Sequence, residues 1–291
     1  MKNFWVISIS VAVLFAATFV FTISISQKLN NYKSKKEEVV ALLQSDARLG
    51  NVWEWIPIFS PADRIMEEKR ALEKKANLYY NSAVRDGLIL FAVVVVFLLV
   101  NSWFYRKKEY SHQMIGLALV SSSLCFLYLG LQSPFLEIEA FKDDFTVSAE
   151  LADYGLSDTI KGRIYFFYQN HNVMELIKLL YTGGNFFVAI LLLTFSVVFP
   201  TIKLISSVVV FLSPASGFAK NAVTTINKLG KWSMADVFVA SIFLAYFSFS
   251  NSNLGIDTGS TTLIGLHFFV AFVIFSIFSG IYLKKTVIAQ H

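Results

Sequence analysis

Long apolar runs alternate with charged stretches along the chain. Six windows hold about 20 apolar residues each, the length that a helix needs to cross the ~30 Å hydrocarbon core of a bilayer. These windows are Phe4–Ile25, Gly87–Tyr105, Gln113–Leu131, Asn185–Leu212, Ser233–Ser250 and Thr262–Leu283. The pattern predicts an all-α polytopic membrane protein with six transmembrane helices.

The first long polar segment, residues 26–86, has a helical pattern. Apolar residues follow a three-four spacing from Leu29 to Leu43, and Lys36 interrupts the seam. A second helix, over 61–105, is expected to run without a break from this segment into the second window. At ~1.5 Å per residue it would be ~67 Å long. The two helices form either a hairpin that packs on itself or an arm that docks a partner.

The second long polar segment, residues 132–184, has a different pattern. Apolar and acidic residues alternate in Phe135–Phe141 and, less cleanly, in Phe145–Leu151, which indicates short strands. From Asp158 the sequence indicates a helix that ends at the glycine pair beginning with Gly183. We therefore expect a small mixed α/β loop at this position.

The short loops predict the orientation, because Lys and Arg there favour the cytoplasmic side. Basic residues fill the links between windows two and three and between windows four and five, and Lys284 with Lys285 follows the last window. This arrangement places both termini in the cytoplasm and residues 26–86 and 132–184 outside. Residues 1–26 are expected to be an uncleaved anchor, although a signal peptide is the alternative.

Composition agrees with a membrane protein, since 55% of the residues are hydrophobic and the mean hydropathy is +0.58. The net charge of +5 sits at the ends of the windows and does not indicate nucleic-acid binding. The single cysteine, Cys125, rules out an intramolecular disulfide and a thiolate metal cluster. No phosphate loop, metal motif or nucleophile–base order is present, so neither enzyme activity nor a cofactor is expected.

Two ionisable residues inside the windows are candidate functional residues, because charge at bilayer depth is unfavourable. Lys203 and Asp236 lie on successive windows, ~14 Å and ~5 Å from the cytoplasmic boundary by helical rise. A long lysine side chain can cover much of that difference, so the two charges can pair. Such a pair is either a static salt bridge or a coupling site that changes its protonation or partner during a conformational cycle. In a third possibility no pair forms, and the Lys203 side chain extends alone to the lipid headgroups.

Polar neighbours surround the candidate pair. Thr194, Ser196 and Ser233 lie close in sequence to the two charges, and Pro200 frees the carbonyl of Ser196 and permits a bend. An interrupted helix beside a buried charge is common at transport sites. His267 is a weaker candidate, since a lone membrane histidine is more often a packed, hydrogen-bonded ring than a proton relay.

Two sequence stretches carry a resemblance to a known family. SVVFPTIKL (Ser196–Leu204) is followed about 30 residues later by KWSMADVFVA (Lys231–Ala240). This pairing resembles the paraquat-inducible protein A (PqiA) family, and the likeness covers roughly residues 113–285. The signature positions of the second stretch are Trp232, Ser233, Met234, Asp236, Val237 and Phe238.

The resemblance implies a multi-pass protein of the bacterial inner membrane that passes phospholipid to or from an MCE-domain protein of the periplasm. It implies a four-helix PqiA-like module over residues 111–291, with Lys203, Asp236 and Ser233 as its polar network. Residues 1–110 would add two transmembrane helices that flank a periplasmic helical hairpin. The zinc ribbons of better-known members cannot form with one cysteine. A non-transporting scaffold or assembly factor for an envelope complex is the alternative function.

Overall fold

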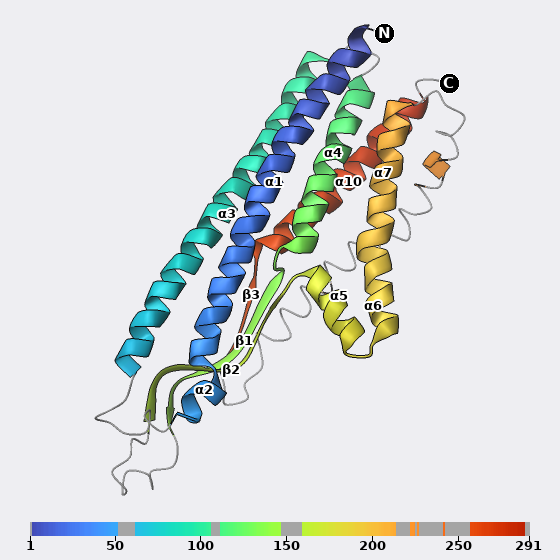
Figure 1. The fold of residues 1–291 in the computed structure, drawn as a ribbon. Helices are drawn as coiled ribbons and strands as arrows, with labels where there is room; N and C mark the ends of the chain where they lie inside the picture. The colour runs from blue at the N-terminus through green and yellow to red at the C-terminus, as the bar shows by residue number, and fades with distance from the viewer. Residues whose placement is uncertain are drawn as a thin grey trace, which may run out of the picture.

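The computed structural model describes residues 2–51, 62–105, 111–146, 159–213, 222–224, 226, 241 and 257–288. The long helices are α1 (Lys2–Leu43), α3 (Ala62–Phe104), α4 (Ser111–Gln132), α6 (Phe186–Leu193), α7 (Phe199–Leu212) and α10 (Ile264–Ile288). A π-helical turn, η3 (Thr194–Val198), joins α6 to α7 into one continuous rod. Figure 1 shows that α1 begins and α10 ends at the same end of the molecule, opposite the strands.

Five helical segments of the described chain are long and apolar enough to cross a membrane. They coincide with five of the six expected windows: α1, α3, α4, the α6–η3–α7 rod and α10. The remaining window, Ser233–Ser250, lies outside the described residues. The structure therefore confirms a multi-pass helical protein, while the count of six spans stays a prediction.

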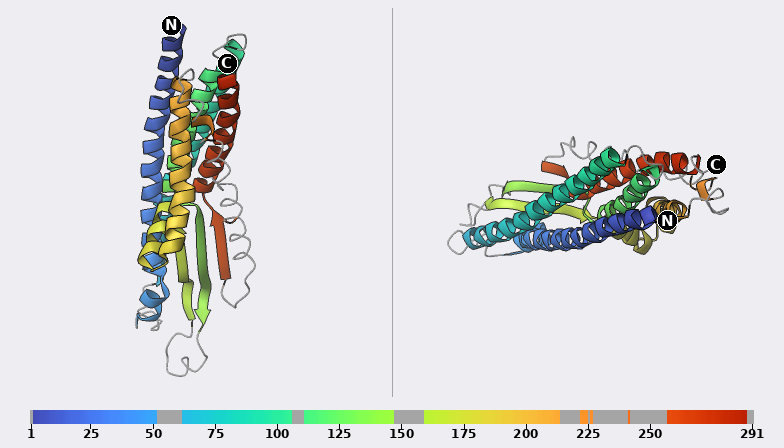
Figure 2. Two further views of the ribbon diagram at one scale, coloured as in Figure 1. Left: turned by 90° about the vertical axis from the view of Figure 1, so that its right-hand side faces the viewer. Right: turned by 90° about the horizontal axis from the view of Figure 1, so that it is seen from above.

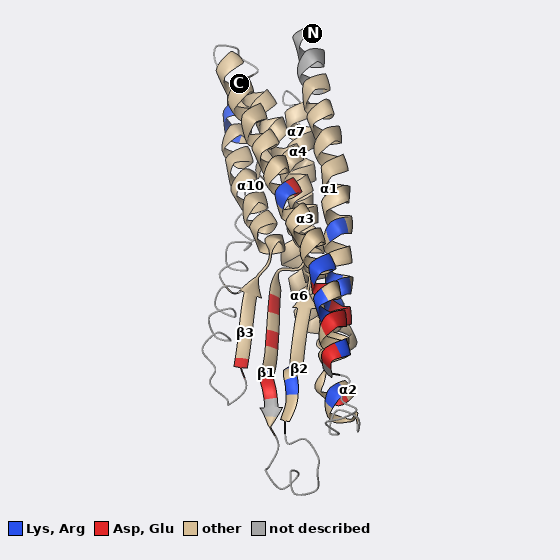
Figure 3. Ribbon diagram, turned by 90° about the vertical axis from the view of Figure 1, so that its left-hand side faces the viewer, with Lys and Arg blue, Asp and Glu red and all other residues tan. Residues whose placement is uncertain are grey.

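Helices α1 and α3 run side by side over the length of the molecule, as the two views of Figure 2 also show. The expected unbroken helix from the first polar segment into the second window is confirmed by α3, which has 43 residues. Charged residues gather on the half of both helices nearer the strands (Figure 3). An ion pair of 2.5 Å between Lys28 and Asp86 joins the two helices where this half begins. The apolar half is suited to lipid and the charged half to water.

Helix α4 is the centre of the helical bundle and is buried along nearly its full length. It packs against α1, α3, α7 and α10. At Gly116 the ring of Phe211 from α7 occupies the space of a side chain, since an added Cβ would lie 2.2 Å from the ring. Close approach at a small residue is how membrane helices gain packing contacts without a hydrophobic driving force between them.

A three-stranded antiparallel sheet lies at the end opposite the termini (Figure 1). Its strands are β1 (Leu136–Thr146), β2 (Thr159–His171) and β3 (Asp257–Thr262), and their order is β2-β1-β3. Leu136 pairs with His171 on one side and with Thr262 on the other. β1 therefore forms the middle of the sheet, and the expected strand at its start is confirmed.

Two expectations for this region were wrong. Residues from Asp158 were expected to be helical, but Thr159–His171 forms β2, because the aromatic and β-branched run Ile164–Tyr168 favours a pleated surface. The sequence before the last window was expected to be a short loop, but Asp257–Thr262 forms the third strand. α10 consequently begins at Ile264, two residues after the expected start at Thr262.

A short helix, α5 (Val173–Thr182), follows β2 and leads into α6. Asn172 caps its first turn, and the helix ends at Gly183 and Gly184, as expected. Gly184 has a φ of +83°, which a glycine adopts without strain. The segment between α4 and α6 thus contains the strands β1 and β2 and the helix α5, which agrees with the mixed loop that the sequence predicts.

Candidate functional site

A pocket of about 700 Å³ lies between α1, the end of α4, α5 and α6. We call it the α5–α6 pocket. Its polar wall contains Asn30, Gln132, Asn172 and Glu175, and its apolar wall contains Met174, Ile177, Ala189, Ile190 and Leu193. Lys178 and Tyr181 of α5 also line the pocket. One cavity therefore offers polar groups on one side and hydrocarbon on the other.

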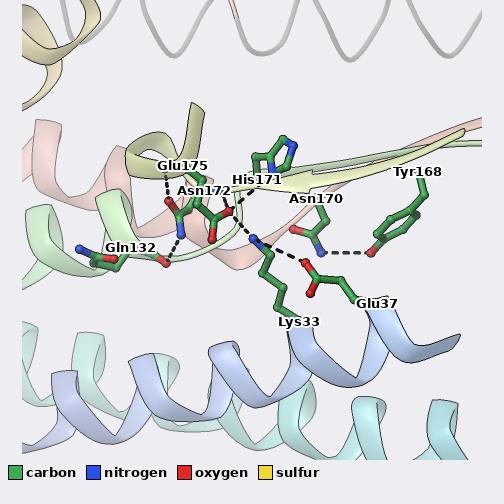
Figure 4. A network of polar contacts seen from close by, with 8 residues as sticks. All are labelled: Lys33, Glu37, Gln132, Tyr168, Asn170, His171, Asn172 and Glu175. Carbon is green, nitrogen blue, oxygen red and sulfur yellow. Dashed lines mark hydrogen bonds and ion pairs between the residues drawn. The ribbon is translucent and has the colours of Figure 1, made fainter. Parts of the chain in front are cut away.

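The polar wall is built around the start of α5 (Figure 4). The Asn172 Oδ1 accepts a hydrogen bond of 2.8 Å from the Glu175 N–H, and the Glu175 carboxylate accepts one of 3.2 Å from the Asn172 N–H. These reciprocal bonds are a capping box, which satisfies two otherwise free backbone donors. The Asn172 Nδ2 also donates to the Gln132 carbonyl at 3.1 Å and so attaches α5 to the end of α4.

Glu175 also connects α5 to α1. Its Oε2 accepts a hydrogen bond from the Lys33 ammonium and lies 3.6 Å from the His171 Nδ1. Burial alone would raise the pKa of the Glu175 carboxyl, but the bonds from Lys33 and the Asn172 N–H outweigh burial and lower it. The carboxylate is therefore charged at neutral pH, and it holds three elements together at the pocket's polar wall.

The apolar wall faces the lipid-exposed part of the bundle. Ala189 of α6 is 2% exposed and lies at the pocket, whereas its neighbour Phe187 is 79% exposed. α5 is amphipathic, and its Leu179 is 47% exposed. These exposed apolar side chains next to the pocket are suited to contact with lipid.

The π-helical turn and Pro200 follow the α6 residues of the apolar wall in the sequence. Phe199 donates its N–H to the carbonyl of Thr194, five residues earlier, and Pro200 follows in the first turn of α7. The Thr194 hydroxyl donates a hydrogen bond of 2.7 Å to the Ile190 carbonyl. The side chain of Ser196 is buried. Such single π-turns recur at functional sites within membrane and soluble helices.

Lys203 lies one turn beyond Pro200 and points toward α10. Its Nζ donates a hydrogen bond of 2.9 Å to the hydroxyl of Ser276, which is 3% exposed. Within the described chain no hydrogen bond joins Lys203 to Thr194 or Ser196. Sequence reasoning missed Ser276, since nothing in the sequence indicates which face of α10 meets α7.

The other half of the expected charge pair, Asp236, lies outside the described residues. So do Ser233 and the signature residues Trp232, Met234, Val237 and Phe238. The pairing of Lys203 with Asp236 therefore stays a prediction. His267 is described, and its Nδ1 lies 3.3 Å from the Leu263 carbonyl on an exposed face of α10.

A second polar cluster fastens α1 to the sheet. The Glu137 carboxylate, only 6% exposed, accepts a hydrogen bond of 2.9 Å from the Tyr32 hydroxyl and lies 3.2 Å from the Lys36 ammonium. Lys36 is the residue that interrupts the apolar seam of α1, and this contact explains the interruption. On the same face of β1, burial raises the pKa of Glu139.

The α5–α6 pocket is a candidate ligand-binding site in the described structure. Its two walls match an amphiphile, with a charged or polar head against Glu175 and Asn172 and a chain against α6. Among the described residues, no three His, Cys, Asp or Glu side chains are placed to hold a metal ion. The sequence contained one signal for this site, the Asn-x-x-Glu capping pattern at Asn172.

The comparison with known proteins finds a family model that matches part of the chain. The family described as paraquat-inducible protein A matches residues 159–289, which run from β2 to the end of α10. The match begins later than residue 113, where the resemblance was expected to start. No curated protein and no solved structure matches the chain. Residues 159–289, which contain β2, α5 and the Lys203 region, are similar to the paraquat-inducible protein A family.

Proposed function

We propose that the protein is an envelope lipid-transport component that binds phospholipid in the α5–α6 pocket and passes it to or from an MCE-domain partner. The observation that supports this proposal is the lining of the pocket, which is polar at the start of α5 and apolar along α6. A phospholipid has the same division between head and chains. A pocket of about 700 Å³ accommodates a head and the upper part of its chains, not a whole lipid.

The pocket's position supports lateral exchange with the membrane. α6 packs against α5 and η3, while most of its other side chains are exposed. The polar wall is rigid, because the Glu175 network attaches it to α1 and α4. The π-turn and Pro200 are where α6 can tilt relative to α7 and widen the pocket toward lipid.

The proposed orientation places the pocket in the outer leaflet of the bacterial inner membrane. α1 begins and α10 ends at the end of the molecule opposite the sheet, and Lys284 and Lys285 lie on the last turns of α10. Basic residues at this end favour the cytoplasm, which puts the sheet and the pocket on the periplasmic side. A periplasmic MCE-domain partner would then reach the pocket directly.

A transfer assay tests the function. Full-length protein in liposomes with a fluorescent phospholipid is mixed with a soluble MCE-domain acceptor, and transfer of the label is followed. Ala189→Phe fills the pocket, and we expect roughly tenfold slower transfer, equivalent to ~1.4 kcal/mol of added activation free energy. Ile205→Phe, at a position 54% exposed to lipid on α7, is the matched control and should transfer at the wild-type rate.

Two outcomes would contradict the proposal. Wild-type rates in Ala189→Phe would mean that lipid does not pass through the pocket. Wild-type transfer no faster than that of protein-free liposomes would favour the alternative, a scaffold or assembly factor that recruits an envelope partner through α1 and α3.

A further inference from the structure

The lining of the α5–α6 pocket contains one charge of each sign. Glu175 is its acidic lining residue and Lys178 is its basic one, and both belong to α5. Residues three apart in sequence are neighbours on a helix surface, with Cβ atoms about 5–6 Å apart. The two charged side chains therefore lie next to each other at the pocket.

The positive charge of Lys178 is not compensated within the described chain. Its side chain is exposed, and no carboxylate of the described residues forms an ion pair with it. Lysine binds phosphate groups in many proteins, because its ammonium donates charge-assisted hydrogen bonds to the phosphate oxygens. A phosphate that enters the pocket thus has one cation available to it.

The Glu175 carboxylate keeps an oxygen available for a ligand. Its Oε2 accepts hydrogen bonds from the Lys33 ammonium and the Asn172 N–H, and it lies 3.6 Å from the His171 Nδ1. No described residue donates to its Oε1. An ionised carboxylate has about four acceptor positions. Because the Glu175 side chain is also 39% exposed, it can accept a further hydrogen bond.

The charges behind the polar wall favour a cation at Glu175. The Lys33 ammonium also lies 3.8 Å from the Glu37 carboxylate, so two carboxylates share one ammonium. The three groups together carry one negative charge. With Lys178 included, the polar wall has no net charge but has a separate negative and positive group, which matches a ligand head that is itself dipolar.

An aromatic pair supports a position of this wall at the level of the lipid headgroups. Tyr181, one turn after Lys178, lines the pocket and is 57% exposed. Its ring packs edge to face on Phe186 at the start of α6, with centroids 5.0 Å apart. Tyrosine is enriched where the bilayer meets water. The apolar residues farther along α6 would then contact the lipid chains.

We propose that the α5–α6 pocket selects phospholipids whose head carries both a phosphate and a protonated primary amine, as in phosphatidylethanolamine. Lys178 binds the phosphate, and Glu175 accepts a hydrogen bond from the ammonium. Two carbon atoms separate these groups in the head, a span that fits two side chains on one helix turn. Phosphatidylglycerol has the phosphate but no cation for Glu175. This selectivity rests on the proposed function and names its substrate class.

The test is photo-crosslinking of full-length protein in nanodiscs that contain equal amounts of phosphatidylethanolamine and phosphatidylglycerol with identical chains. A benzophenone amino acid at Ile177 samples the pocket, and one at Phe187 samples the surrounding lipid. We expect the ratio of ethanolamine to glycerol adducts at Ile177 to be about fourfold that at Phe187, the effect of one partly exposed ion pair. Glu175→Gln, which keeps the capping pattern, should lower the ratio at Ile177 to that at Phe187.

Lys178→Gln should reduce both adducts at Ile177 about fourfold and leave their ratio unchanged. Lys161→Gln, at an exposed lysine of β2, is the matched control and should change neither adduct. Thermal melting checks that each variant folds; should Glu175→Gln fail to fold, the wild-type ratio and Lys178→Gln decide.

The outcomes separate this selectivity from lipid binding itself. Lipid adducts at Ile177 with the same ratio as at Phe187, or enrichment of phosphatidylglycerol at Ile177, would overturn the selectivity while lipid binding in the pocket stands. A wild-type ratio in folded Glu175→Gln would also overturn it. The absence of any lipid adduct at Ile177 would contradict the proposed function, and the selectivity with it.

Discussion

Gly265→Ala is expected to lower the thermal unfolding midpoint in detergent by about 5 °C or more, from an overpacking energy of ~1–3 kcal/mol. Gly265 is the second residue of α10 and lies against the turn between α4 and β1, where its N–H donates to the Pro134 carbonyl at 3.2 Å. An added Cβ would lie 2.4 Å from that oxygen and 2.7 Å from the Ser133 oxygen. Both are backbone atoms, so no side chain can rotate away to relieve the clash.

Gly280→Ala provides the matched control on the same helix. Among the described residues, no atom outside the helix's own neighbouring backbone lies within 4 Å of a Cβ added at Gly280. The midpoint should therefore stay within about 1 °C of wild type or rise slightly through better helix propensity. Equal unfolding midpoints for Gly265→Ala and Gly280→Ala would contradict this prediction. They would show that the contact of Gly265 with the turn at Pro134 does not determine where α10 begins.

Glu137→Ala is expected to destabilise the protein by about 3–5 kcal/mol, because removing one partner of a buried ion pair leaves the other without compensation. The Glu137 side chain is 8% exposed and that of Lys36 is 20% exposed. The Tyr32 hydroxyl loses its acceptor in the same variant. Hydrogen exchange should then increase on the sheet-side half of α1 more than on α4.

The exposed pair between Arg163 and Asp143 is the control for this prediction. Its Nε–Oδ1 distance is 3.0 Å, but the Asp143 side chain is 54% exposed, so Asp143→Ala should cost no more than about 1 kcal/mol. The Arg163 guanidinium lowers the pKa of Asp143, which shows that the two groups interact. A larger effect for Asp143→Ala than for Glu137→Ala would contradict the role given to the buried cluster.

Much of the helical architecture follows from the sequence. The apolar windows give the membrane helices, and the absence of breakers predicts that α3 continues from the polar region into the bilayer. The end of α5 was predictable because Gly183 and Gly184 terminate helices. These features depend on neighbours along the chain, so a local pattern is sufficient.

The sheet required long-range information. β3 pairs with β1 across more than a hundred residues, from Leu136 to Thr262, and its short polar sequence carries no strand signal of its own. β2 occupies a stretch for which the local sequence predicts a helix. Pairing with β1 is what determines its conformation.

The candidate site shows the same limit. Lys203 was identified from its position inside an apolar window, but its partner Ser276 comes from a helix more than 70 residues away. Glu175 and Asn172 form a local capping box, whereas the contact of Glu175 with Lys33 joins residues from different elements. Residues whose role depends on a distant element cannot be found from spacing alone.

The most direct test of phospholipid binding in the α5–α6 pocket is photo-crosslinking in native membranes. A benzophenone amino acid is placed at Ile177 in the pocket or at Phe187 on the lipid-facing surface of α6, and the lipid adducts are measured by mass spectrometry. We expect Ala189→Phe to remove most of the adduct at Ile177 and to leave that at Phe187 unchanged. A phospholipid adduct at Ile177 that is unaffected by Ala189→Phe, or the absence of any lipid adduct at Ile177, would contradict the account.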